Sequence, residues 1–223
     1  MPNINDRIGS QNVIRVLSNA SAPPTRLVNL SDVNSSRKTE NGMVLVWNSS
    51  SETFVMSDQF TSANFIKYVE SGFFNNTIFH RVIPGFVIQG GDPNSKDENR
   101  MNDGTGGRAG KFFGIGREDD PSTWTIPAEF NDKDHVKGTL SMARSKDPNS
   151  GSSQFFVCHA STPQLNNQYT VFGQVIQGLE VIDQIVYSDT PRKQNPGYRG
   201  PDGDNPLEKV EMEVKLVNRS DID

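Results

Sequence analysis

The chain has 223 residues, which is long enough for one large domain or for one domain with a short appendage. Hydrophobic residues make up 33% and charged residues 22%, and the 13 phenylalanines exclude the composition of a disordered chain. The formal net charge is −5 and the basic residues are scattered, so we expect no nucleic-acid partner, because phosphate neutralisation needs concentrated positive charge.

Residues 1–42 are predicted to form an extended N-terminal arm. They hold the short apolar pieces VIRVL and RLVNL between polar stretches, which is too little apolar surface for a core of their own. The first residues, MPNINDRIGSQ, lack the basic start and the apolar stretch of a secretory signal. A signal removed from a longer precursor stays open as an alternative. Residues 43–223 are predicted to form the folded domain.

The first half of this domain alternates strands, a helix and a long loop. MVLVW and ETFVM, joined by NSSS, predict a β-hairpin. SDQFTSANFIKYVESGFF predicts a helix with Ser57 or Asp58 as its cap and Gly72 at its end; its apolar stripe is Phe60, Ala63, Phe65, Ile66 and Val69. TIFHRVI and FVIQGG predict two short strands about a turn at Pro84 and Gly85. Residues 90–123, dense in Gly, Asp and Asn, predict an ordered functional loop.

The second half continues with short strands. TLSMAR, SQFFVCH and YTVFGQVI predict buried strands, and GLEVIDQIV predicts a short helix. After a Pro/Gly-rich stretch, VEMEVKLV alternates strictly and predicts a final strand with one face in water. Many short strands with two helices indicate a closed or nearly closed β-barrel capped by helices, because closure removes exposed edges.

The sequence lacks the usual catalytic and membrane signals. His80, His135 and His159 have no metal-ligand spacing with one another or with the single cysteine, Cys158, so we expect no metal and no disulfide framework. There is no Walker loop or nucleophile elbow, and GTGG at 104–107 is a weak phosphate signal because no helix pattern follows it. No run approaches the ~18 apolar residues of a membrane span. We therefore expect no cofactor and no membrane contact.

Three polar side chains stand in apolar strands. Arg81, Gln89 and Gln154 lie near phenylalanines in the sequence. One interpretation is that each is a buried polar group satisfied by backbone carbonyls. Burial of an arginine without a carboxylate partner is costly, so for Arg81 a role at a cleft is favoured.

Five motifs follow one another along the chain: FHRVIPGFVIQGGD, GTGG, GTLSMAR, SSQFFVCHA and YTVFGQVIQGLEVID. Together they resemble the cyclophilin-type peptidyl-prolyl cis-trans isomerases, and SGFFNNTIFHRVIPGF resembles the bacterial members especially. The resemblance covers residues 43 to about 218. It implies a mainly β fold, a closed eight-stranded antiparallel β-barrel capped by two helices, and an enzyme that isomerises X-Pro bonds in proline-containing peptides or proteins.

The resemblance also implies the site residues. Arg81 matches the catalytic arginine and acts with Phe86 and Gln89. The implied substrate-binding positions make up the proline pocket, the groove beside it and a flanking loop: Val87, Gly104, Thr105, Ala143, Arg144, Gln154, Phe156, Gln164, Leu165 and Tyr169. In this mechanism the apolar pocket holds the proline ring, Arg81 donates to the prolyl nitrogen of the twisted amide, and Gln89 aims the guanidinium.

Some positions depart from the eukaryotic pattern of the family. Val87 replaces the usual Met, Arg144 the usual Asn and Tyr169 the common His. Gln164 replaces a Trp whose indole assists cyclosporin binding, so we expect weak cyclosporin binding. An insertion at 108–123 and a long loop at 188–206 are further additions, either of which narrows the groove or serves a partner.

The arm carries a second resemblance. NDRIGSQNVIRVLSNASAPPTRLVNLSDVNSS, followed by NGMVLVWNSSSETFVM, resembles modules in structural proteins of tailed bacteriophages. It implies virion partners or self-association through residues 1–42, and a location in the virion or host cytoplasm; an ordinary flexible leader is the alternative. Without a phage origin, the bacterial cytoplasm is expected, or the periplasm if a signal peptide was removed. Two functions therefore stand: an active isomerase, and a virion structural or attachment protein whose domain mainly binds peptides.

Overall fold

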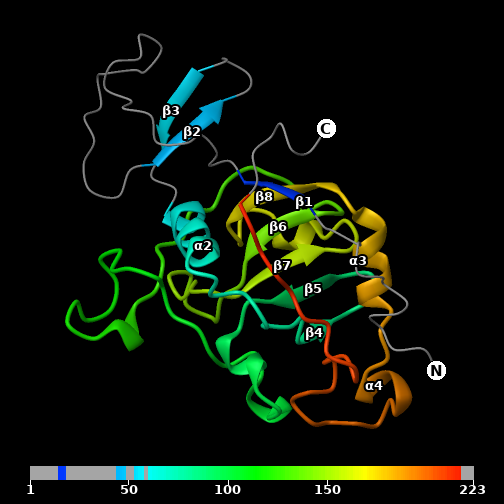
Figure 1. Ribbon diagram of the computed structural model, residues 1–223. Helices are drawn as coiled ribbons and strands as arrows, with labels where there is room; N and C mark the ends of the chain where they lie inside the picture. The colour runs from blue at the N-terminus through cyan, green and yellow to red at the C-terminus, as the bar shows by residue number, and fades with distance from the viewer. Residues whose placement is uncertain (1–14, 19–43, 49–52, 58–59, 217–223) are drawn as a thin grey trace.

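The computed structural model describes residues 15–18, 44–48, 53–57 and 60–216, and it describes side chains for residues 60–216 (Figure 1). The strands are β1 (Arg15–Ser18), β2 (Val44–Asn48), β3 (Thr53–Ser57), β4 (Arg81–Val82), β5 (Val87–Gly90), β6 (Thr139–Met142), β7 (Phe155–Cys158) and β8 (Val171–Gln177). The α-helices are α2 (Phe60–Glu70), α3 (Leu179–Val186) and α4 (Pro191–Gln194), and short 3-10 turns lie at Pro93–Lys96, Arg100–Asn102, Pro121–Thr123 and Pro163–Leu165.

Most strands join one antiparallel sheet in the order β1-β8-β6-β7-β5-β4. Five of its strands, from β8 to β4, have described side chains. β1, which belongs to the predicted N-terminal arm, pairs with β8. β2 and β3 pair with each other, as predicted for the hairpin, and form a separate two-stranded sheet.

The closed eight-stranded barrel is not confirmed. Within the described residues the large sheet has six strands, and its edge strands β1 and β4 do not pair with each other. Two of the predicted strand segments do not join this sheet as regular strands. The β2–β3 hairpin has its ladder partners within itself, and the last predicted strand contributes one isolated bridge, Ile78 to Glu211. The described sheet is therefore open.

The predicted final strand still lies along the chain before β4. Backbone N–H groups of Asn76 and Phe79 donate to the carbonyls of Met212 and Val210 at 3.1 and 3.0 Å, and Met212 donates back to Thr77 at 2.9 Å. Val210 and Met212 are buried, whereas Glu211 and Glu213 are exposed. The alternation predicted from VEMEVKLV is confirmed at residues 210–213, whereas Leu216 is exposed and the segment is not a regular strand.

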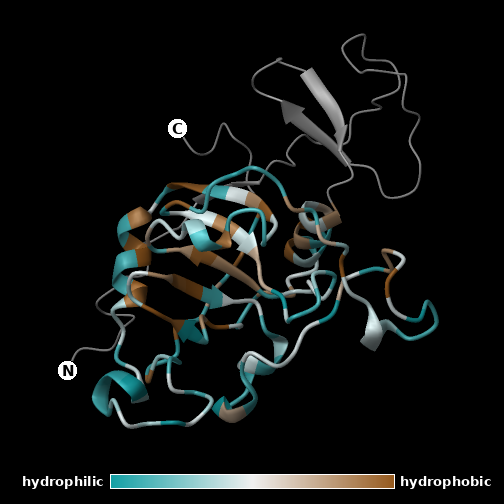
Figure 2. Ribbon diagram, turned by 180° about the vertical axis from the view of Figure 1, so that it is seen from behind, coloured by the Kyte–Doolittle hydropathy of each residue, from teal (hydrophilic) through white to brown (hydrophobic). Residues whose placement is uncertain are grey.

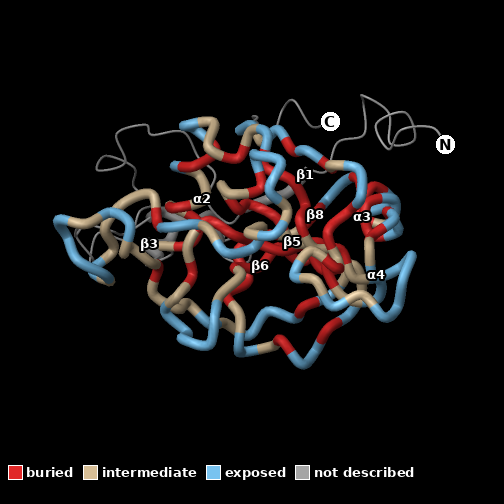
Figure 3. Tube along the Cα trace, turned by 90° about the horizontal axis from the view of Figure 1, so that it is seen from below, coloured by how far each residue is buried: buried red, intermediate tan, exposed pale blue. Residues whose placement is uncertain are grey.

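The main hydrophobic core lies between the sheet and the helices α2 and α3, which stand at opposite ends of the sheet (Figures 1 and 3). Phe65 of α2 packs on Phe74, Phe155 and Phe172, with ring centroids 5.0 to 5.4 Å apart. α3 buries Val181, Ile182, Ile185 and Val186, the spacing of one helix face. Apolar residues gather on the strands and α3, while the outer loops are hydrophilic (Figure 2).

The buried side of α2 differs from the predicted apolar stripe. Thr61, Asn64 and Tyr68 are buried, because the helix packs on loops as well as on the sheet. Asn64 Nδ2 donates to Ser152 O at 2.8 Å, and Tyr68 Oη donates to Arg108 O at 2.5 Å. These polar contacts satisfy groups that would otherwise be costly to bury. α2 thus fastens the start of the inserted loop to the domain.

The two ends of α2 were predicted with unequal success. Gly72, with φ 66°, follows the helix, and Phe73 N donates to Tyr68 O at 2.9 Å, which is the expected glycine stop. The predicted cap positions, Ser57 and Asp58, fall outside the described side chains. Glu129 is the observed acceptor: its Oε1 and Oε2 accept from the N–H groups of Phe60 and Thr61 at 2.7 and 2.8 Å. No helix in the described part of the chain is long and apolar enough to cross a membrane.

Candidate functional site

Arg81 and Gln89 face each other across the β4–β5 hairpin. Gly85, with φ 76°, forms the turn, which Ile83 closes by donating its N–H to Val87 O at 2.9 Å. This turn places Arg81 opposite Gln89 in the register. Arg81 Nη1 donates to Gln89 Oε1 at 3.1 Å.

One face of the sheet carries the site residues in a row. The register aligns Arg81 with Gln89, Gln89 with Phe156, and Phe156 with Ser141. Directly opposed residues of neighbouring antiparallel strands point to the same face. The residues next to them, Val82, Ile88, Val157 and Leu140, point to the other face and belong to the main core. Because side chains alternate between the two faces, the candidate site residues lie on one face of the sheet and the core residues lie on the other.

A chain of side-chain amides fixes the orientation of Arg81. Gln154 Nε2 donates to the carbonyls of Gly104 and Gly106 at 3.0 and 2.7 Å. Carbonyls only accept, so Gln154 Oε1 is left to accept from Gln89 Nε2 at 3.0 Å. Gln89 Oε1 then faces the guanidinium. The two glycine carbonyls therefore fix the orientation of Gln154, which fixes that of Gln89, which accepts from Arg81. We call Arg81, Gln89 and Gln154 the amide relay.

Gly106 of GTGG allows close packing against Asp92 and Asn94. The Asp92 carboxylate is buried and accepts from Asn94 N at 2.8 Å and from Gly106 N at 3.1 Å. A Cβ on Gly106 would collide with Asp92 Oδ1 and would lie 2.8 Å from Asn94 Cγ. Gly104 and Thr105 are exposed, and the contact of this loop with the relay comes from the Gly104 and Gly106 carbonyls.

A second hydrophobic cluster adjoins the relay and is separate from the main core. Val87, Phe156, Cys158 and Leu165 are buried in it, and three partly exposed residues pack against them: Phe86, Ala143 and Tyr169. Tyr169 meets Phe156 edge to face at 5.6 Å. The Arg81 guanidinium carbon lies 5.7 Å from the Phe86 ring centroid, so a charge borders an apolar surface. We call these seven residues the apolar cluster.

Burial lowers the pKa of Arg81, and Asp204 is the nearby charge that most opposes this effect. Arginine nevertheless stays protonated in proteins. Within the described residues Arg81 has no ion-pair partner at 4.0 Å or less. Its charge is therefore available beside the apolar cluster.

Two predicted substrate-binding residues lie at the edge of the apolar cluster and are not members of it. Arg144 stacks on Tyr169 at 4.5 Å, and its Nε and Nη2 donate to Gln168 O at 3.0 and 2.8 Å. It therefore supports Tyr169 from the outer side. Gln164 is exposed, and its backbone carbonyl accepts from Gln168 Nε2 at 3.1 Å.

His135 supports the apolar cluster and was not predicted. Its ring stacks on Phe156 at 6.0 Å with 21° between the planes. Ser141 Oγ donates to Thr170 O at 2.9 Å, and His135 Nε2 and Nδ1 lie 3.0 Å from Ser141 Oγ and 3.1 Å from Asn166 Oδ1. Burial lowers the pKa of His135, while the bond with Asn166 opposes this. A lone histidine before a strand carries no spacing signal, so sequence reasoning had nothing to detect.

His159 holds the turn between β4 and β5. Gly85 N donates to His159 Nδ1 at 2.9 Å, so this nitrogen carries no proton. His159 Nε2 lies 3.2 Å from Asp183 Oδ1, and Lys137 Nζ lies 2.6 Å from the same oxygen. No group of three or more His, Cys, Asp or Glu in the described part of the chain has the arrangement of a metal site.

Comparison with known proteins connects this geometry to a family. The profile described as "Cyclophilin type peptidyl-prolyl cis-trans isomerase/CLD" matches residues 53–212. A probable peptidyl-prolyl cis-trans isomerase of Brucella abortus is 38% identical over 136 residues, which is 61% of this chain and 64% of the relative. A peptidyl-prolyl cis-trans isomerase of Synechococcus elongatus is 44% identical over 131 residues, 58% of this chain and 75% of the relative. The match thus spans less than two thirds of the Brucella protein.

A solved structure is similar as well. It is the crystal structure of a Cryptosporidium parvum cyclophilin-type peptidyl-prolyl cis-trans isomerase in the presence of the dipeptide Ala-Pro. The TM-score is 0.55 at 30% identity, and the alignment covers 71% of this chain and 85% of that one.

Proposed function

The chain belongs to the cyclophilin-type peptidyl-prolyl cis-trans isomerase family, and on this premise we propose that it catalyses cis-trans isomerisation of X-Pro bonds. The observation that carries the proposal is the amide relay beside the apolar cluster: Arg81 Nη1 bonds Gln89 Oε1 at 3.1 Å and the guanidinium borders Phe86. The names of the relatives give further support.

The chemistry needs neither acid, base nor nucleophile. Rotation about a peptide bond meets a barrier of ~18–20 kcal/mol because the C–N resonance is lost, and X-Pro bonds take tens to hundreds of seconds unaided. In the twisted amide the nitrogen lone pair becomes localised and accepts a hydrogen bond. Arg81 donates to it, and this interaction is stronger in the transition state than in the ground state. Each ~1.4 kcal/mol of such preference is tenfold in rate.

The remaining residues position the substrate. The apolar cluster, in particular Phe86, Phe156 and Leu165, holds the proline ring and keeps water from the guanidinium, which strengthens its electrostatic effect. Gln89 and Gln154 keep the guanidinium aimed at the prolyl nitrogen. The similar Cryptosporidium parvum enzyme was crystallised in the presence of Ala-Pro, which supports a proline-containing ligand for this chain.

A protease-coupled assay with a proline-containing chromogenic peptide tests the proposal. The whole chain is expected to speed the cis-to-trans step in proportion to its concentration. A peptide-binding module without turnover is the second function considered above. It would bind the same peptide in a calorimetric titration and leave the rate of isomerisation at the uncatalysed value, and that outcome would contradict the proposal.

Cyclosporin is expected to bind weakly, because Gln164 stands where eukaryotic members have a Trp. Gln164 is the exposed middle residue of the 3-10 turn Pro163–Leu165, so a larger ring fits there without repacking the core. Gln164→Trp is expected to tighten binding by about tenfold or more, since a well-placed indole contact contributes on the order of 1–2 kcal/mol. Isothermal titration of both proteins measures this. Nanomolar binding by the unchanged chain would contradict the expectation.

We further propose that residues 1–42 serve assembly, in a phage particle or through self-association. The support is the sequence resemblance of the arm, and the family profile, which starts only at residue 53. Removing residues 1–42 is expected to lower the mass of the assembly and to leave turnover unchanged. Light scattering of both proteins checks this prediction. A full-length monomer that trimming does not alter would favour the ordinary leader instead.

A further inference from the structure

Arg192 and Asp204 form an ion pair at the outer edge of β4. Asp204 lies directly beside the strand, because its carbonyl oxygen accepts from Val82 N at 2.8 Å. Arg192 belongs to α4, and its Nη1 pairs with Asp204 Oδ2. Arg81 is the neighbour of Val82 in the chain. The long loop at 188–206 thus brings a carboxylate and a second guanidinium to the edge of the strand that carries Arg81.

Both charges act on Arg81. Asp204 is the largest charge that opposes the lowering of the Arg81 pKa by burial, and Arg192 adds to the lowering. Arg81 itself is bonded to a neutral acceptor, Gln89 Oε1. Hydrogen bonds from a guanidinium to a carboxylate are about twice as strong as those to a neutral amide. Asp204 is therefore a competitor of Gln89 for Arg81.

We propose that Arg192 occupies Asp204 and thereby keeps Arg81 on Gln89, in the orientation that turnover needs. In this arrangement Arg192 is a positioning residue, since it acts on Arg81 by occupying Asp204. The part of the inference that concerns turnover rests on the proposed isomerase function. The part that concerns where the Arg81 guanidinium lies does not.

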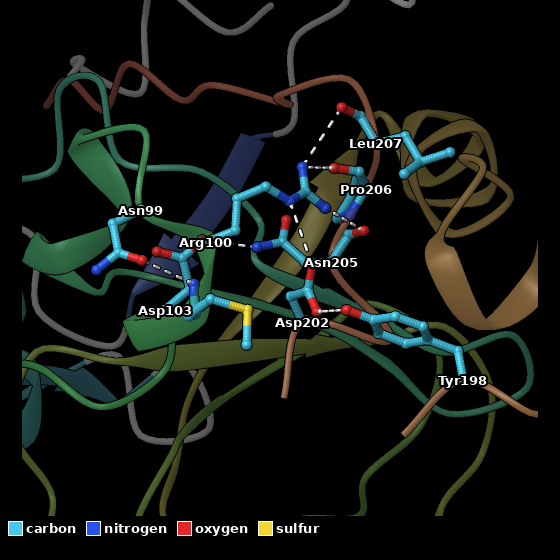
Figure 4. A network of polar contacts seen from close by, with 9 residues as sticks. Asn99, Arg100, Asp103, Tyr198, Asp202, Asn205, Pro206 and Leu207 are labelled. Atoms are coloured by element: carbon cyan, nitrogen blue, oxygen red, sulfur yellow. Dashed lines mark hydrogen bonds and ion pairs between the residues drawn. The ribbon is translucent and has the colours of Figure 1, made fainter. Parts of the chain in front are cut away.

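The position of Asp204 does not depend on Arg192, because a separate network fixes its segment (Figure 4). Arg100 donates to the carbonyls of Asn205 and Pro206 at 2.8 and 2.7 Å and lies 3.6 Å from Asp202. Asn205 Nδ2 in turn donates to Asp103 Oδ2 at 2.6 Å. If Arg192 is removed, the backbone of Asp204 therefore stays beside β4, and its carboxylate is left without this partner.

The loop is shaped to let Arg192 reach Asp204. Arg192 N donates to Gly203 O at 2.9 Å, and a Cβ on Gly203 would lie 2.6 Å from Arg192 Nη2. Lys193 does not take over this role, because its Nζ donates to Val186 O and Ser188 O at 2.8 and 2.6 Å. Side-chain exposures of 44% for Arg192 and 22% for Asp204 indicate a pair that contributes little to stability. Removal of Arg192 is therefore expected to leave the fold intact.

Four variants of the full chain test the inference. Arg192→Ala is expected to lower kcat/KM by about fivefold to tenfold, because the freed carboxylate captures Arg81. Asp204→Asn alone is expected to leave it within about twofold, and Arg192→Ala with Asp204→Asn is expected to restore it to within about twofold. Arg199→Ala is the matched control: this exposed arginine of the same loop binds the carbonyls of Pro196 and Tyr198, at 2.9 and 3.1 Å. It is expected to change nothing.

Rescue by the second substitution separates positioning from a structural role, since a structural pair loses further contacts in the double variant. The arginine Nε–Hε signal of Arg81 in NMR spectra, assigned by its absence in Arg81→Lys, gives a readout without turnover. It is expected to shift in Arg192→Ala and to return in the double variant. An unchanged signal in Arg192→Ala, or a double variant as slow as the single one, overturns the inference. If the unaltered chain itself shows no turnover, the proposed function fails, while the NMR signal still decides the placement of Arg81.

Discussion

Arg81→Ala is expected to lower kcat/KM for a proline-containing peptide by about 10²–10³, the usual cost of removing one donor to a transition state. In this chain the Arg81 guanidinium lies at the apolar cluster, 5.7 Å from the Phe86 ring centroid, and the relay holds it there. Since no covalent step assists, the loss falls mainly on kcat. The protease-coupled assay with increasing peptide concentration measures both parameters.

The fold is expected to survive this substitution. Arg81 is partly exposed, and within the described residues its side chain donates to Gln89 and lies near the Phe86 ring. Arg81→Lys is a matched control that keeps the charge but cannot keep the planar fork, so it should recover only part of the rate. Thermal unfolding at an unchanged temperature for all three proteins would show that the loss is chemical. Turnover of Arg81→Ala equal to that of the unaltered chain would remove Arg81 from the mechanism.

Acid is expected to destabilise the fold through His80, the residue before Arg81. Burial is the main cause that lowers the pKa of His80 to about 4, and neither ring nitrogen has a hydrogen-bond partner within the described residues. The unfolded chain keeps the ordinary value of about 6.5. Between pH 6.5 and 4 the unfolded state therefore binds more protons than the folded state. Stability is complete above pH 6.5 and falls as the pH drops towards 4, by about 3 kcal/mol from this residue.

His80→Leu isolates this contribution, because leucine stays buried and does not titrate. Urea unfolding at pH 7 and at pH 4.5 is the measurement. The unaltered chain is expected to lose more of its unfolding free energy between the two values than the variant, and the variant should be no less stable at pH 7, since it removes unpaired nitrogens. Equal losses in both proteins would show that other groups carry the acid sensitivity.

Local patterns made most of the described elements predictable. The helical spacing around Phe65 and the glycine stop at Gly72 predicted α2, and the Pro84–Gly85 turn predicted the β4–β5 hairpin. The strict alternation of VEMEVKLV predicted the burial of Val210 and Met212 and the exposure of Glu211 and Glu213, but not the exposure of Leu216. Barrel closure was not predictable in the same way, because it depends on which strand edges pair between distant parts of the chain. In the structure β2 and β3 pair with each other and form a separate sheet.

For the site, the chemical type of the residues was more informative than their spacing in the sequence. Polar side chains in apolar strands singled out Arg81, Gln89 and Gln154, and the structure brings these three together. The supporting contacts stayed hidden, because they join distant segments. Glu129 caps α2 although it lies 69 residues after Phe60 in the sequence, and Arg100 bonds Asn205, which lies 105 residues later. The sequence around Glu129 or Arg100 contains no pattern that indicates such a distant partner.

Exchange NMR on a proline-containing peptide with a small amount of the full chain tests the proposed catalysis most directly. It observes cis and trans peptide signals at equilibrium, without a coupling protease. Exchange cross-peaks that appear with the unaltered chain and vanish with Arg81→Ala, while both proteins still shift the peptide signals, are the expected result. Shifted signals with no exchange cross-peaks from the unaltered chain would mean that the domain binds proline peptides without isomerising them.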